Sequence, residues 1–201
     1  FQIYRDSFQG NVQAKILFGN FTLSRGETVY LDPTIETFGS EPSLDGYIYK
    51  YALGEYPPSR ETHVVTGDNY IIVGQMSNLD RPPYPYYKYR GYVSFDTSSI
   101  PSLAYNISAT LKAKTYLRLG TDFTLEVIGG QQPVYGDSLD ADDWDVGNLP
   151  ITTWDTANYP GNNIYVNLPI SSDQINKVGR TQFRLVSNRD EENIEPDGRE
   201  Y

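Results

Sequence analysis

The sequence predicts an all-β protein, an antiparallel β-sandwich of jelly-roll type with at most one short helix. Three observations support this prediction. Apolar and polar residues alternate with a period of two wherever a pattern can be read. Turn residues separate the alternating runs, since the 201-residue chain contains 17 Gly and 13 Pro. Only one segment, residues 172–177, looks helical, with Ser171 or Ser172 as its N-cap and Gly179 as its stop.

The N-terminal part of the chain carries a weak β pattern around Val29 and Leu31. A loop over residues 37–42 separates it from the regular alternation that follows. We therefore expect an N-terminal β-arm or strand-exchange segment over residues 1–45 and a sandwich domain over residues 46–201.

The strongest strand signals lie in the middle of the chain. Within residues 89–96 and residues 107–119, odd and even positions alternate in character. This pattern is typical of a strand with one face in a core and the other in water. Shorter alternating runs occur at residues 123–127, 164–168 and 183–185.

Composition excludes several classes of protein. Lys and Arg number 16 against 26 Asp and Glu, so the net charge is 16 − 26 = −10. Such a chain lacks the positive charge that supplies most of a protein's affinity for nucleic acid. No window approaches the roughly 18 apolar residues of a membrane span. The chain has no Cys and a single His, His63, which excludes disulfides and cysteine nucleophiles and argues against a zinc enzyme.

Several segments resemble a known family. Residues 90–101, RGYVSFDTSSIP, and residues 107–111, ISATL, resemble the R-G-Y-L-x-F-D-T-S-x-I-P and I-x-x-A-x-L stretches of the disaggregatase-related (DNRLRE-type) β-sandwich domains. The segments 142–145, 182–190 and 196–201 are similar to later parts of these domains, so the resemblance spans residues 60–201.

This resemblance implies a jelly-roll sandwich, usually non-catalytic, on secreted and cell-surface proteins, notably of methanogenic archaea. Some relatives are carbohydrate-binding modules. Family members usually continue with one or two strands after the Glu-Tyr pair at residues 200–201. We expect the N-terminal arm or a neighbouring copy to supply the corresponding strand.

The Pro- and Tyr-rich stretch at residues 82–90 is the candidate binding segment. Tyr rings can stack on sugar faces, while Lys and Arg bind acidic groups. The same rings also suit the end of a core or a contact between subunits. We expect Arg90 to pair with Asp96, which falls on the same face of the strand. The predicted ligand-binding residues are Tyr84, Tyr86, Tyr87, Lys88 and Arg90.

A dense cluster of aspartates could supply the oxygen ligands that calcium prefers, although their spacing does not fit an EF-hand. The alternative is a solvated acidic loop. The candidate metal ligands are Asp137, Asp140, Asp142, Asp143 and Asp145. Sequons at Asn20 and Asn106 are candidate glycosylation sites if the chain passes through a glycosylating pathway.

We expect no enzymatic activity. The Gly-Asp-Ser-Leu run at residues 136–139 matches an esterase signature, but the only histidine lies upstream and has Arg60 three residues before it. The predicted function is a non-catalytic extracellular cell-surface module that binds polysaccharide or mediates adhesion. The alternative is a structural subunit of a surface layer, filament or virus particle that assembles with copies of itself by strand exchange.

Overall fold

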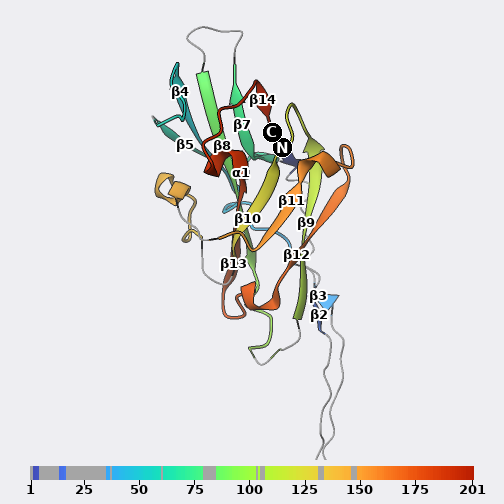
Figure 1. Cartoon of the computed structure of the whole chain (residues 1–201). Coiled ribbons are helices and arrows are strands. Elements are labelled where there is room, and N and C mark those ends of the chain that lie inside the picture. The colour runs from blue at the N-terminus through green and yellow to red at the C-terminus, as the bar shows by residue number, and fades with distance from the viewer. Residues whose placement is uncertain are drawn as a thin grey trace, which may run out of the picture.

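The computed structural model describes residues 2–4, 14–16, 35–36, 38–59, 61–78, 85–102, 104, 107–130, 134–145 and 149–201. Antiparallel strands dominate it (Figure 1). The mostly-β class is thereby confirmed, while the jelly-roll topology stays a prediction.

The larger sheet has eight strands. Its main order is β11-β10-β13-β8-β4-β5, with β7 paired to β8 and β14 paired to β7. The strands are β4 (Gly46–Leu53), β5 (Thr62–Thr66), β7 (Gly74–Ser77), β8 (Pro85–Asp96), β10 (Thr124–Gly130), β11 (Thr152–Asp155), β13 (Arg180–Ser187) and β14 (Arg199–Glu200).

The second sheet is built on the antiparallel pair β9 (Ile107–Leu117) and β12 (Tyr165–Ile170). Short strands pair with the other edge of β9 or with one another: β1 (Gln2–Tyr4), β2 (Ala14–Ile16), β3 (Ile35–Glu36) and β6 (Tyr70–Ile72). The alternation predicted for β9 is confirmed in the burial of its side chains. Leu111 and Ala113 are buried, whereas Lys112 and Lys114 are partly exposed.

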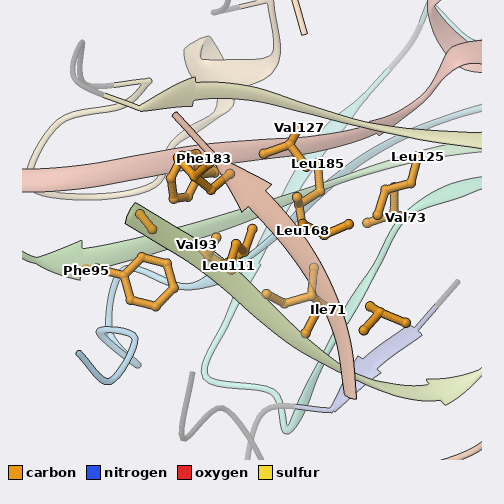
Figure 2. Packing of buried hydrophobic residues seen from close by; sticks show 14 of the residues in the cluster. Ile71, Val73, Val93, Phe95, Leu111, Leu125, Val127, Leu168, Phe183 and Leu185 are labelled. Carbon is orange, nitrogen blue, oxygen red and sulfur yellow. The ribbon is translucent and has the colours of Figure 1, made fainter. Parts of the chain in front are cut away.

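The main core lies between the two sheets (Figure 2). Val93 and Phe95 of β8 are fully buried there, and β9 contributes Leu111. Gly91 occupies a position where a side chain has no room, since an added Cβ would lie 2.5 Å from Ile71 Cγ2. The sheets therefore pack closely at this point.

A second cluster of buried residues covers the opposite face of the larger sheet, which we call its outer face. Its members are Leu44, Ile48, Tyr92, Val134, Tyr135, Leu139 and Trp144. Tyr92 and Ser94 point to this side and are 0% exposed. The prediction that one face of residues 89–96 lies in water was therefore wrong, because the segment around residues 134–145 packs on that face.

The described part of the chain contains one short α-helix, α1 (Asn188–Glu191), which the Ser187 side chain caps by accepting from the backbone N–H of Arg189. The predicted helix at residues 172–177 is a single 3-10 turn, η4 (Ser172–Gln174). Ile175 ends this turn in an extended conformation and is buried in the main core. Further 3-10 turns are η2 (Ala141–Asp145) and η3 (Thr156–Asn158).

Candidate functional site

The pleat of β8 divides the residues predicted to bind ligand. Tyr87 shares the core-facing side of the strand with Tyr89, and their rings lie 6.0 Å apart. Lys88 and Arg90 point to the outer face, on the same side as Tyr86, because successive side chains of a strand alternate. Tyr84 lies outside the described residues, as do the two sequon asparagines Asn20 and Asn106. The structure therefore does not bring the predicted set together.

Lys88 and Arg90 belong to a buried network of charges. Asp190 of α1 is 1% exposed and lies between them, with Oδ1 2.7 Å from Lys88 Nζ and Oδ2 2.6 Å from Arg90 Nε. Burial favours a lower pKa for Arg90, but the charge and hydrogen bond of Asp190 raise it overall. The expected partner Asp96 is instead exposed, and it accepts hydrogen bonds from Ser98. These cations hold α1 on the sheet.

Trp144 completes this network from above the sheet. The Arg90 guanidinium lies 4.2 Å from the centre of its ring, a cation–π contact. Arg90 and Arg184 each donate through Nη1 to the Trp144 carbonyl oxygen, at 2.6 and 3.0 Å. The tryptophan thus packs η2 onto the outer face of the sheet.

Four of the five candidate metal ligands have separate partners. Asp137 pairs with Arg180 at 2.6 Å, and Asp145 lies 3.7 Å from Arg90. Asp140 accepts from the backbone N–H of Asp142, Asp143 accepts from the backbone N–H of Asp140, and Asp142 is exposed. Within the described ranges, no group of three or more His, Asp or Glu side chains could hold a metal ion. The predicted calcium site has no support from this geometry.

The core-facing side of the larger sheet carries a row of aromatic rings, of which sequence reasoning named only Tyr87 as a binding residue. The pleat of β4 places Tyr47, Tyr49 and Tyr51 on this side, and the register pairs Tyr49 with Tyr89 and Tyr51 with Tyr87. A readable signal was present, since tyrosines at residues 47, 49 and 51 follow the two-residue period of a strand. We call these five tyrosines, together with His63 of β5, the tyrosine face.

Neighbouring rings of the tyrosine face lie close together; three pairs are nearly parallel, and others, such as Tyr49 and Tyr89 at 37°, are tilted. Tyr51 and Tyr87 are 5.9 Å apart with an interplanar angle of 25°, and Tyr87 and Tyr89 are 6.0 Å apart at 10°. His63 stacks on Tyr49 at 4.7 Å and 14°. The rings of three adjacent strands thus form one continuous aromatic surface.

Burial decreases along β8 towards this surface. Val93 and Phe95 are fully buried, whereas Tyr87 and Tyr89 are partly exposed. Figure 1 shows why, because the upper ends of β4 and β8 stand apart from β9 and β12 of the second sheet. Tyr51 is also partly exposed. The tyrosine face therefore continues the core into a region that solvent reaches.

Carboxylates border the tyrosine face. The Tyr51 hydroxyl donates to Glu61 at 3.2 Å, and the Tyr47 hydroxyl donates to Asp68 at 3.2 Å. His63 Nε2 lies 3.3 Å from the same Glu61 carboxylate. The charge of Glu61, followed by its hydrogen bond, raises the pKa of Tyr51.

The structure does not place His63 next to Ser138 of the esterase-like motif. Ser138 is exposed beside Leu139, which packs on the outer face of the sheet. His63 stacks on Tyr49 on the opposite face. The sheet therefore separates the two residues that a serine hydrolase would need in contact.

Comparisons of the chain with protein-family models, with curated proteins and with solved structures found no match. In the described part of the chain, no helix is long and apolar enough to cross a membrane.

Proposed function

We propose that this protein is a non-catalytic extracellular cell-surface module that binds polysaccharide at the tyrosine face. The observation that supports the proposal is the row of partly exposed rings on adjacent strands. The resemblance of residues 60–201 to disaggregatase-related domains agrees with this function and with a jelly-roll sandwich.

The chemistry of the tyrosine face suits neutral sugars. Tyrosine rings stack on the apolar faces of pyranose rings, and rings already fixed on a sheet lose little conformational entropy when a ligand binds. Glu61 and Asp68 at the border offer acceptors for sugar hydroxyls. Acidic polysaccharides are disfavoured, because the chain carries a net charge of −10.

The test is a double substitution, Tyr51→Ala with Tyr87→Ala, measured by affinity electrophoresis in a panel of neutral and acidic polysaccharides. Loss of two central contacts should weaken binding to a neutral polysaccharide by roughly 30-fold or more. Tyr116→Ala with Tyr165→Ala is the matched control, because these exposed tyrosines lie on the outer side of the second sheet. Equal affinity in the two double variants would exclude the tyrosine face as the site.

A structural subunit that assembles by strand exchange is the second candidate. The observation that favours it is the outer edge of the larger sheet, since β5 pairs only with β4 among the described residues. An unpaired edge can accept a strand from another chain. Sedimentation velocity separates the two candidates, because strand exchange gives concentration-dependent polymers and a binding module stays a single species.

A further inference from the structure

A cavity of about 400 Å³ opens on the outer face of the larger sheet. Its lining includes Arg90 of β8, Arg184 of β13, Glu126 of β10 and Glu191 of α1. The exposed Leu149 forms part of its wall. The volume falls in the range of small-molecule sites, about 300–1,000 Å³.

Arg184 lines this cavity and carries a buried donor that no described residue uses. The residue is 4% exposed, with Nη1 bonded to the Trp144 carbonyl and Nη2 bonded to Glu191 at 3.1 Å. Its Nε is buried without a hydrogen-bond partner among the described residues. A buried donor that stays unpaired destabilises the protein, so a ligand that reaches it with an acceptor gains affinity.

Glu126 offers an unused acceptor beside it. In the register of β10 and β13, Ile128 pairs with Arg184 and Glu126 pairs with Val186, so Glu126 lies diagonally from Arg184 on the same face. Its carboxylate is half-buried and has no hydrogen-bond or ion-pair partner in the described part of the chain. Burial, followed by the charges of Glu191 and Glu192, raises its pKa, and Arg184 opposes the rise.

A ligand hydroxyl group can pair with both Arg184 and Glu126, because it accepts a hydrogen bond from a guanidinium and donates one to a carboxylate. We propose that this cavity is a second ligand site, which takes a single sugar residue without acidic groups. Leu149 and Pro150 supply the apolar contact that the C–H face of a sugar needs.

The charge of the cavity selects against acidic sugars. Two arginines, Arg90 and Arg184, face three carboxylates, Glu126, Asp145 and Glu191, so the lining carries 2 − 3 = −1. A sugar carboxylate would add a like charge, whereas an ammonium group would add an opposite one. The site is therefore expected to bind amino sugars at least as well as neutral sugars and to reject uronic acids.

This inference is independent of the proposed function, because the cavity and the tyrosine face lie on opposite sides of the larger sheet. The test uses the full chain and follows backbone amide signals by NMR during titration with methyl β-glucoside, methyl β-galactoside, glucosamine and glucuronic acid. Signals of β10, β13 and α1 should move with at least one neutral sugar or with glucosamine. Affinity for glucuronic acid should be roughly tenfold weaker.

Glu126→Gln is the decisive variant, because it keeps the shape of the side chain and removes its charge. It should weaken sugar binding roughly tenfold, the loss expected for a charge-assisted hydrogen bond. The Tyr51→Ala, Tyr87→Ala double variant should bind these monosaccharides as the wild type does. The proposal is overturned if none of the four probes moves these signals, if glucuronic acid binds as tightly as the others, or if Glu126→Gln leaves the affinity unchanged.

Discussion

Asp190→Asn should destabilise the protein more than its small chemical change suggests. The carboxylate is 1% exposed and is shared by Lys88 and Arg90, which are 4% and 6% exposed. Removal of one partner of a buried ion pair costs about 3–5 kcal/mol, because the remaining charges stay buried without compensation. Asparagine has nearly the same shape, so the loss measures charge rather than packing.

The structure favours the lower end of this range. Lys88 would keep its contacts with the Asp190 carbonyl and with Asn193 Oδ1, both at 2.8 Å. Arg90 would keep the Trp144 carbonyl at 2.6 Å and Glu191 at 3.4 Å. We therefore expect a loss of about 3 kcal/mol, which is a large share of a typical total of about 5–15 kcal/mol.

Urea unfolding followed by tyrosine and tryptophan fluorescence measures this loss. With a slope of about 2 kcal/mol per molar urea, the midpoint should fall by roughly 1.5 M. Asp137→Asn is the matched control, because its ion pair with Arg180 is exposed on both sides and such pairs contribute about 0–1 kcal/mol. If the two variants lower the midpoint equally, the buried network does not stabilise the fold as argued.

Three further predictions concern packing and charge. Gly91→Ala should lower the free energy of unfolding by about 1–3 kcal/mol, because the added Cβ would overlap Ile71. Gly39→Ala is the control, since it has open space around it and should change the free energy of unfolding little. Equal melting temperatures of the two variants would contradict this prediction. The folded state raises the pKa of Glu126. Its stabilising contribution to the free energy of unfolding is therefore complete below the unfolded-state pKa and is lost as pH rises through the folded-state pKa. Glu126→Gln should therefore raise the melting temperature at neutral pH and leave it unchanged in acid, and the opposite trend would reverse the argument. Calcium should not change the melting temperature, since four of the five loop aspartates have separate partners; a clear rise would restore the predicted calcium site.

The class of the fold was readable from the sequence because a strand on a core repeats its chemistry every two residues. That rule located β8 and β9, and it also marks the tyrosines of β4, which were overlooked although their period is the same. The burial of the outer face of β8 was not readable. Val134, Leu139 and Trp144 cover it from a segment without any period, so no local pattern shows where they pack.

The ion-pair partner of Arg90 could not be predicted from the sequence either. Asp96 lies on the same strand face and was the natural choice, yet Asp190 is 100 residues away in sequence. Charge pairing across such a separation depends on which elements the topology brings together, and the sequence holds many other carboxylates. A pattern within one strand therefore indicated that Arg90 forms an ion pair but did not identify the carboxylate that pairs with it.

The buried network and the tyrosine face occupy opposite sides of the same strand. Lys88 alternates with Tyr87 and Tyr89 along β8, and its ion pair with Asp190 fixes the strand against α1. If the Lys88–Asp190 ion pair fixes the positions of the Tyr87 and Tyr89 rings, Asp190 is a positioning residue for polysaccharide binding, although it lies on the outer face of the sheet. Under conditions where Asp190→Asn is still folded, its affinity for a neutral polysaccharide should fall several-fold, because part of the binding energy is then used to order the rings. Asp137→Asn should keep wild-type affinity, and an equal affinity in both variants would limit the role of the network to stability.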